Sequence, residues 1–207
     1  MKNIAVLVSG GGTNLQALID SDIRGGKITA VISSNPEAYA LERAKKAGIP
    51  GYVVRRKDYP TNQAMTLALV EKLKSLNIDL VVLAGFMTIL TVEMVKAYPN
   101  AIINVHPALI PSFCGEGFYG LHVHEAALAY GVKLSGATVH FVSEECDGGP
   151  IIAQKAVPVL PGDTPEVLQK RIMQEAEWVL LPEAVSLFCQ DRLEVRGRTV
   201  IVKEQTL

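Results

Sequence analysis

An amide and an imidazole stand close together at the end of an apolar segment, in the sequence Asn104-Val105-His106-Pro107. Residues two apart in an extended chain point to the same side, so Asn104 and His106 are expected to face one space. Pro107 disfavours the helical region for His106 and keeps it extended. An amide that stabilises an oxyanion beside an imidazole that moves a proton suits chemistry at a carbonyl group. The alternative is a structural Asn at a strand end beside a partly buried His.

A second polar group lies further along the chain, in an acidic loop between two apolar segments. The loop reads Ser143-Glu144-Glu145-Cys146-Asp147-Gly148-Gly149-Pro150. Because glycines follow Asp147 directly, we expect its side chain to turn inward and those of Glu144 and Glu145 to face water. An Asp beside His106 would orient the imidazole and raise its affinity for a proton. The alternative is an Asp that only initiates a turn.

Three consecutive glycines, Gly10 to Gly12, follow the first apolar run and precede a predicted helix. Thr13 is the expected N-cap of that helix, with Gln16 completing a capping box. Glycines let backbone N–H groups approach a ligand, and a helix N-terminus adds positive potential, so this layout is typical of an anion site. Asn14 adds a side-chain donor. Glycines that serve only the turn are the alternative.

The kind of anion follows from the patterns that the glycine loop does not match. A dinucleotide fingerprint needs a further glycine at position 15, where the chain has Leu15. A Walker loop needs a Gly-Lys-Ser/Thr sequence, and the chain has none. The loop therefore favours a phosphate monoester over NAD or ATP.

Alternating strand-like and helix-like segments position these residues in the first half of the chain. The expected strands are 4–8, 28–33, 52–54, 79–84 and 101–105, and the expected helices begin at 13 or span 37–47, 62–76 and 91–97. This alternation predicts βαβ units and a parallel sheet. Open parallel sheets bind ligands at the carboxyl ends of their strands, where His106 is expected to lie.

The second half of the chain has a different pattern. We expect a helix at 123–130, strands at 137–142 and 151–157, a long helix at 164–188 and a hairpin over 193–202. The short polar connection between the two strands favours an antiparallel pair. The predicted fold class is therefore α/β. It is a single-domain Rossmann-like sheet with a parallel N-terminal half and antiparallel C-terminal strands.

Composition limits the classes of partner. The 207 residues are 49% hydrophobic and carry 20 basic against 21 acidic side chains, a net charge of −1. This balance argues against nucleic acid and anionic membranes, and no apolar run approaches the ~20 residues of a membrane helix. Three cysteines without a C-x-x-C pair suggest neither a disulfide framework nor a thiolate zinc site. We expect one cytoplasmic domain with small-molecule partners and no metal.

Five segments together resemble one enzyme family. They are Ser-Gly-Gly-Gly-Thr-Asn-Leu-Gln (9–16), Leu-Ala-Gly-Phe-Met (83–87), Asn-Val-His-Pro-Ala-Leu-Ile-Pro (104–111), Gly-Ala-Thr-Val-His-Phe (136–141) and Asp-Gly-Gly-Pro (147–150). In order and spacing they are similar to phosphoribosylglycinamide formyltransferase, a folate-dependent family of purine biosynthesis. The resemblance covers nearly the whole chain. It implies formyl transfer from 10-formyltetrahydrofolate to the amine of 5-phosphoribosylglycinamide.

The resemblance also implies roles for the candidate residues. Asn104 would bind the formyl oxygen, His106 would act as the general acid, and Asp147 would hold and polarise His106. The residues matched to the acceptor's phosphate and ribose are Gly12, Thr13, Asn14 and Glu175. Without the resemblance, Glu175 is one more charge on a helix.

The same resemblance implies a folate pocket with apolar walls and mostly backbone contacts. The residues matched to it are Asn62, Met87, Thr88, Ile89, Leu90, Asn104, Ser143, Glu144, Glu145, Cys146 and Asp147. Thr88 and Asn62 depart from the family pattern, because relatives often carry basic side chains there. The loop 112–120 is longer than in many members, and Phe118 and Tyr119 are predicted to form a lid over the folate. A self-packed aromatic pair is the alternative.

We expect residues 1–105 to bind the phosphosugar, and residues 106–207 to bind the folate and carry out catalysis. A related folate-dependent formyltransferase or a formyltetrahydrofolate deformylase is the alternative function. A non-catalytic phosphosugar-binding domain is more distant, because it would not need Asn104, His106 and Asp147 together. A monomer or a homodimer is expected. The remaining histidines, His122, His124 and His140, are weaker candidates for a role.

Overall fold

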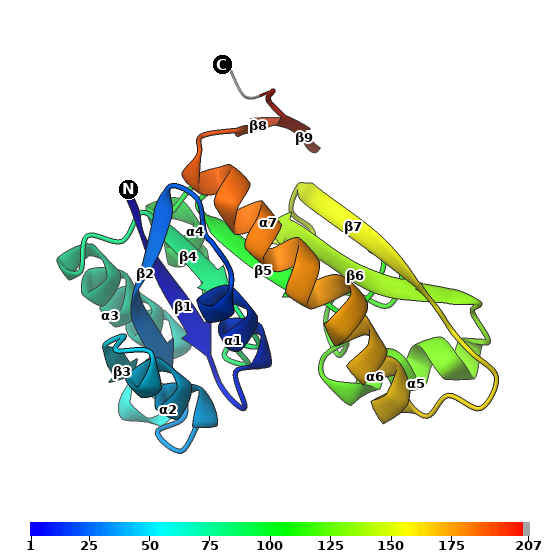
Figure 1. The fold of residues 1–207 in the computed structure, drawn as a ribbon. Helices are drawn as coiled ribbons and strands as arrows, with labels where there is room; N and C mark the ends of the chain where they lie inside the picture. The colour runs from blue at the N-terminus through cyan, green and yellow to red at the C-terminus, as the bar shows by residue number, and fades with distance from the viewer. Residues whose placement is uncertain (205–207) are drawn as a thin grey trace. The chain divides into compact units, whose positions relative to one another are not determined.

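The computed structural model of the chain describes residues 1–204. The chain divides after Asn104 into two compact units, coloured from blue to green and from green to red in Figure 1. Among the described residues, no helix is both long and apolar enough to cross a lipid bilayer.

The N-terminal unit contains a parallel sheet with the strand order β3-β2-β1-β4-β5. Its strands are β1 (Lys2–Val8), β2 (Gly26–Ser33), β3 (Gly51–Val53), β4 (Leu80–Leu83) and β5 (Ile102–His106). Residues 4–8 are fully buried, as a continuous apolar run in a central parallel strand requires. Leu83 pairs with both Leu7 and Asn104, so the carboxyl ends of β1, β4 and β5 lie at one edge of the sheet.

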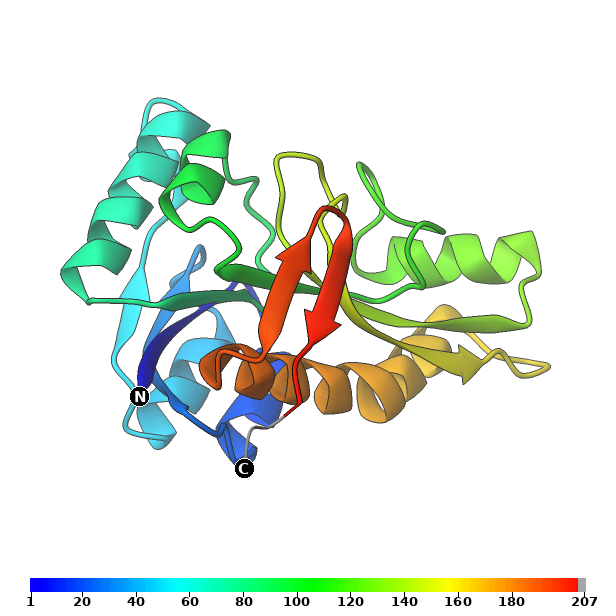
Figure 2. The ribbon, with the colours of Figure 1, turned by 90° about the horizontal axis from the view of Figure 1, so that it is seen from above.

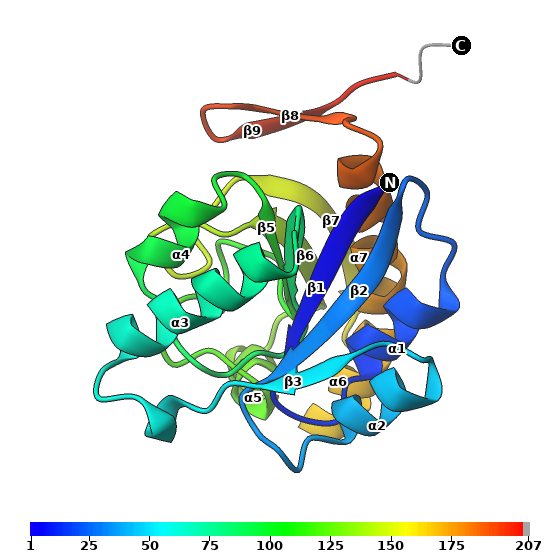
Figure 3. The same ribbon diagram turned by 90° about the vertical axis from the view of Figure 1, so that its left-hand side faces the viewer.

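Helices cover both faces of this sheet. They are α1 (Thr13–Asp20), α2 (Tyr39–Lys46), α3 (Asn62–Ser75) and α4 (Val92–Ala97), with the short 3-10 helix η1 (Arg56–Asp58) before α3. Figure 3 shows α1 and α2 on one face and α3 and α4 on the other. This is the doubly wound arrangement that right-handed βαβ crossovers produce.

The C-terminal unit begins with α5 (Leu121–Tyr130), which leads into the strands β6 (Leu134–Phe141) and β7 (Ile151–Pro158). The two strands are antiparallel, as their short connection predicts. The hairpin of β8 (Leu193–Arg196) and β9 (Thr199–Val202), red in Figure 2, continues the strand order as β6-β7-β9-β8. The predicted fold class, with parallel strands in the N-terminal half and antiparallel strands in the C-terminal half, is confirmed.

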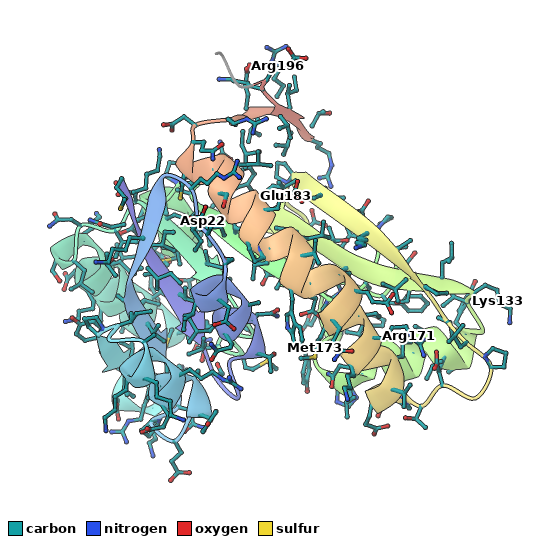
Figure 4. The ribbon with its side chains drawn as sticks, viewed as in Figure 1. Asp22, Lys133, Arg171, Met173, Glu183 and Arg196 are labelled. Carbon is teal, nitrogen blue, oxygen red and sulfur yellow. The ribbon has the colours of Figure 1, made fainter. Side chains whose placement is uncertain are left out.

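The long helical segment of this unit differs from the single regular helix expected over 164–188. It consists of α6 (Pro165–Ile172), a π-helical stretch η2 (Met173–Glu177) and α7 (Trp178–Cys189). Figure 4 labels Arg171 and Met173, on either side of the change to π-helical bonding. Pro182 lies inside α7 and has no N–H for the carbonyl of Trp178, where α-helical bonding resumes. Periodicity alone does not reveal a widened turn of this kind.

Candidate active site

A carboxylate between two imidazoles forms a buried polar cluster in the C-terminal unit. Oδ2 of Asp147 lies 3.4 Å from Nδ1 of His106, and its Oδ1 lies 3.5 Å from Nε2 of His140. The three side chains are 10%, 5% and 2% exposed, respectively. Nε2 of His106 donates to the Phe113 carbonyl at 2.7 Å, and Nδ1 of His140 donates to the Phe141 carbonyl at 2.9 Å. Each ring nitrogen of both histidines therefore faces an oxygen.

This arrangement favours an additional proton. A neutral imidazole carries one N–H, whereas an imidazolium carries two. Since His106 donates through Nε2 to a carbonyl, its Nδ1 can bond Asp147 only when the ring is doubly protonated. The contacts are thus those of an imidazolium held by a carboxylate, which is the state that a general acid needs before it gives up a proton.

Burial works against the charge that these contacts favour. It lowers the pKa of His106 below its ordinary value, although the Asp147 charge and the Phe113 carbonyl raise it and His140 lowers it further. Burial would raise the pKa of Asp147, but the His140 hydrogen bond, the His106 charge and the Gly115 N–H together bring it below its ordinary value. Asp147 raises the pKa of His106, as expected, but the desolvation of the ring lowers this pKa by more.

The backbone around Asp147 explains why this side chain turns inward. Asp147 adopts a left-handed conformation with φ of 52°, and its Oδ2 accepts the Gly115 N–H at 2.9 Å. A Cβ on Gly149 would lie 1.7 Å from the Phe141 carbonyl oxygen, so only glycine fits there. Glu144 and Glu145 are exposed, as expected.

Asn104 lies two residues before His106 on β5 and is half-buried. Side chains two apart on a strand leave the same face. Asn104 and His106 therefore leave the same face of β5, the placement that their spacing in an extended chain predicts.

His140 is the functional candidate that the sequence interpretation undervalued. It lies on β6, where Thr138 and His140 alternate with the apolar side chains of Val139 and Phe141. Thr138 is also hydrogen-bonded, since its hydroxyl donates to the Ala108 carbonyl at 2.7 Å. Two polar residues at period two in a strand that is buried from residue 135 to residue 141 could have indicated a hydrogen-bonded face.

A further histidine, His124, is completely buried on α5. Burial and then the charge of His106 lower the pKa of His124 to about 4. Neither ring nitrogen has a hydrogen-bond partner among the described residues. The side chain is therefore neutral at pH 7, and its protonation would destabilise the folded protein.

The glycine loop of the N-terminal unit starts α1 differently from the expected capping box. Gly12, not Thr13, is the N-cap, with φ of 71° and no side-chain cap. A Cβ on Gly12 would lie 2.6 Å from that of Ala40, whereas a Cβ on Gly10 or Gly11 would meet open space. Positive φ and the close approach of α2 explain the glycine at position 12. Thr13 and Asn14 are half-buried in the first turn of α1.

The loop after β4 carries four of the residues matched to folate. The Met87 N–H donates to the Ser9 hydroxyl at 2.8 Å, and that hydroxyl lies 2.6 Å from the hydroxyl of Ser34. This ties the loop to the ends of β1 and β2. Met87 and Ile89 are 55% and 74% exposed, while Thr88 and Leu90 are half-buried. Exposed apolar side chains on an anchored loop suit a flat apolar ligand.

Asn62 has a specific local partner. Its Oδ1 accepts a hydrogen bond from Nε of Arg56, whose Nη1 donates to the Tyr59 carbonyl at 2.7 Å. Asn62 therefore fixes a guanidinium at the start of α3. This contact holds the positive charge of Arg56 beside position 62.

The remaining predicted residues lie in the C-terminal unit. Ser143 is half-buried, and its hydroxyl donates to the Glu145 carbonyl at 3.1 Å. Cys146 is exposed as a whole residue, but partial desolvation of its thiol, together with the Asp147 charge, raises the pKa of the thiol. Glu175 is exposed within η2, and π-helical turns occur frequently at functional sites.

The aromatic residues of the loop 112–120 pack on their own surroundings. The Phe118 ring lies edge-on to Phe113 at 6.3 Å, and the Tyr119 ring lies edge-on to His122 at 5.1 Å. Phe113 also contacts Tyr130 at 5.9 Å. Phe118 and Tyr119 thus contact different rings, and both the lid over the folate and the self-packed pair stay predictions.

A family model described as formyl transferase matches residues 2–185. The chain belongs to the formyl transferase family. Residues 1–204 place no group of three or more His, Cys, Asp or Glu side chains where they could hold a metal ion. A metal-independent reaction stays a prediction.

Relatives of this formyl transferase include proteins of similar length. It is 42% identical to phosphoribosylglycinamide formyltransferase of Haemophilus influenzae, covering 100% of this chain and 96% of that protein. It is 44% identical to the trifunctional purine biosynthetic protein adenosine-3 of Drosophila pseudoobscura, but spans only 14% of it. The crystal structure of glycinamide ribonucleotide transformylase 1 from Symbiobacterium toebii has a TM-score of 0.93 and 45% identity, covering 99% of this chain and 95% of that one.

Proposed function

We propose that this formyl transferase moves a formyl group from 10-formyltetrahydrofolate to the amine of 5-phosphoribosylglycinamide in purine biosynthesis. The product is 5-phosphoribosyl-N-formylglycinamide. The observation that carries the proposal is the buried pair of His106 and Asp147 at 3.4 Å. His106 lies on β5, the strand that also carries Asn104. Relatives that match over nearly their whole length carry the name of this reaction.

In the proposed mechanism, 10-formyltetrahydrofolate supplies the formyl group. The Asn104 amide donates to the formyl oxygen as negative charge develops on it during amine attack. Nδ1 of His106 faces Asp147, so Nε2 is the nitrogen that delivers a proton to N10 of the folate. The tetrahedral intermediate then collapses, the bond between the formyl carbon and N10 breaks, and tetrahydrofolate leaves. The proton that the attacking amine loses returns to His106 through a water. The Phe113 carbonyl, 2.7 Å from Nε2, marks the acceptor position that a reacting atom or a water takes over. His140 and Asp147 hold the ring in this orientation.

The acceptor is assigned to the glycine loop. Gly12, Thr13 and Asn14 bind its phosphate, chiefly through backbone N–H groups at the N-terminus of α1. A net charge of −1 offers no general positive field, so phosphate binding depends on local groups. Glu175 is the proposed contact to the ribose side.

The folate is assigned to the anchored loop after β4 and to the loop that carries Asp147. Met87 and Ile89 supply exposed apolar surface, and Thr88, Leu90, Asn62 and the segment Ser143–Asp147 complete the proposed contacts. In this proposal residues 1–105 contain the phosphate loop of the phosphosugar site, Asn104 and part of the folate contacts. Residues 106–207 contain His106, Asp147, Glu175 and the other folate contacts. The enzyme works in the cytoplasm as a monomer or homodimer on small molecules, without metal, nucleic acid or membrane.

The alternatives have weaker support. A deformylase would release formate without an amine acceptor, and a phosphosugar-binding domain would not need the buried imidazole–carboxylate pair. The full-length relatives named above favour the transferase over both.

A coupled assay tests the proposal. Tetrahydrofolate release is followed with and without 5-phosphoribosylglycinamide, for the wild type and for His106→Ala. Release should require the acceptor and should be lost in His106→Ala. The matched control is Glu183→Gln, an exposed side chain on α7 labelled in Figure 4, which should behave as the wild type. Acceptor-independent release, or none at all, would contradict the proposal.

A further inference from the structure

The carbonyl oxygens of the glycine loop are all turned toward hydrogen-bond donors. The Gly10 carbonyl accepts the Ala40 N–H at 3.1 Å, and the Gly12 carbonyl accepts the Gln16 N–H at 2.9 Å. The Gly11 carbonyl has a different kind of donor, because it accepts Nε of Arg43 at 2.8 Å. Backbone amides thus fix two of the three peptide groups, and an α2 side chain fixes the third.

Each fixed carbonyl also fixes an N–H. A trans peptide is planar, with its C=O and the following N–H pointing in opposite directions. The Arg43 bond to the Gly11 oxygen therefore sets the direction of the Gly12 N–H. Across residues 1–204, the N–H groups of Gly10, Gly11 and Gly12 donate to no protein atom. Successive N–H groups turned outward in this way form a concave site for an anion.

Arg43 is itself held in place by several contacts. Its Nη1 donates to Oε1 of Gln16 at 2.9 Å, so one guanidinium joins the loop to α1. Its Cζ lies 5.0 Å from the centre of the Tyr39 ring, within the range of a cation–π contact. Arg43 is half-buried. A planar guanidinium with two fixed donors makes this bridge, which a single ammonium cannot reproduce.

We propose that Arg43 is a positioning residue for the acceptor's phosphate. It holds the Gly11–Gly12 peptide with its N–H toward the phosphate and neutralises the carbonyl that would otherwise repel the anion. It does so from behind the loop, without contacting the substrate. This inference rests on the proposed function, since it needs a phosphorylated acceptor at the glycine loop.

Acceptors with and without the phosphate separate this role from a general structural one. Kinetic constants are measured for 5-phosphoribosylglycinamide and for its dephosphorylated form, and inorganic phosphate is used as a competitive inhibitor. In Arg43→Met, KM for the phosphorylated acceptor and Ki for inorganic phosphate should each rise about tenfold, the usual scale for a lost charged hydrogen bond. The KM for 10-formyltetrahydrofolate and kcat/KM for the dephosphorylated acceptor should not change.

Two further variants complete the experiment. Lys45→Met removes an exposed charge from the same helix and should leave all constants unchanged. Arg43→Lys keeps the charge but loses the bridge, so its effect should be intermediate and confined to the phosphorylated acceptor. This variant decides the matter if Arg43→Met does not fold.

The outcomes distinguish the inference from the proposed function. An inactive wild type would overturn both. An active wild type with an unchanged phosphate-dependent KM in both Arg43 variants would overturn only the role of Arg43. Equal losses on the two acceptors would also overturn it, because they would indicate a general structural role.

Discussion

Nε2 of His140 lies 3.5 Å from Oδ1 of Asp147, on the opposite side of the carboxylate from His106. The carboxylate is therefore shared by two rings, and each of its oxygens has its own imidazole. One ring is suited to exchange a proton with substrate, and the other keeps the carboxylate ionised and oriented.

Replacing His140 should change the pH dependence of the reaction more than the binding of either substrate. The His140 hydrogen bond lowers the pKa of Asp147, so its loss in His140→Ala raises that pKa. Asp147 must be ionised to hold His106, and the acid limb of kcat should move to higher pH. The rate at the optimum should fall about tenfold. Stopped assays between pH 4.5 and 8 provide the profile.

His140→Gln is the conservative companion, because its amide can donate to the same oxygen. It should restore part of the acid limb. His122→Ala removes an exposed histidine of the same unit and serves as the control. An acid limb that stays in place in His140→Ala would refute the proposed role of His140.

His124 should make the fold sensitive to acid. Its pKa is lowered to about 4, first by burial, so the unfolded chain takes up a proton near pH 6.5 that the folded chain refuses until about pH 4. Stability is therefore present above pH 6.5 and is lost as the pH falls toward 4, by about 3 kcal/mol in all. Urea unfolding at pH 7.5 and pH 4.5 measures this loss.

In His124→Leu the difference in unfolding free energy between these two pH values should shrink by about that amount. His122→Leu, at an exposed position, should keep the full difference. An identical pH dependence in the wild type and His124→Leu would show that His124 does not titrate as described.

Gly149→Ala should destabilise the protein strongly. The added Cβ would lie 1.7 Å from the Phe141 carbonyl oxygen, so the loop after β6 must shift and carry Asp147 with it. We expect a loss of about 3 kcal/mol or more in unfolding free energy. Gly10→Ala, whose Cβ meets open space, is the stability control. Similar thermal unfolding midpoints for both variants would contradict this explanation of Gly149.

The sequence predicts most of the fold because its signals are local. The apolar run that forms β1 and the polar connection between β6 and β7 each indicate their element within a few residues. The exceptions depend on contacts distant in sequence or on backbone detail. Position 12 needs a glycine because its φ is positive and α2 approaches it at Ala40. The π-helical turn before Trp178 is a detail of backbone hydrogen bonding that the short apolar pattern does not specify.

In the candidate site too, local features can be predicted from the sequence, whereas contacts between distant segments cannot. Asn104 and His106 are predictable because their relation is set by two residues of extended chain. The inward turn of Asp147 is predictable from the glycines that follow it. The place of His140 against Asp147 and the Phe113 carbonyl on His106 depend on how β6 and the loop 112–120 pack. Single residue types in the sequence do not specify that packing.

The pH profile of kcat/KM for Asp147→Asn, measured beside that of the wild type, tests most directly whether Asp147 holds His106 as the general acid. If His106 works as an imidazolium held by Asp147, wild-type kcat/KM falls as the pH rises through the lowered pKa of His106. Removing the carboxylate lowers that pKa further, so the falling limb of Asp147→Asn should lie at lower pH, with the rate reduced about 100-fold at its optimum. An undiminished rate with the falling limb unmoved would contradict the central claim.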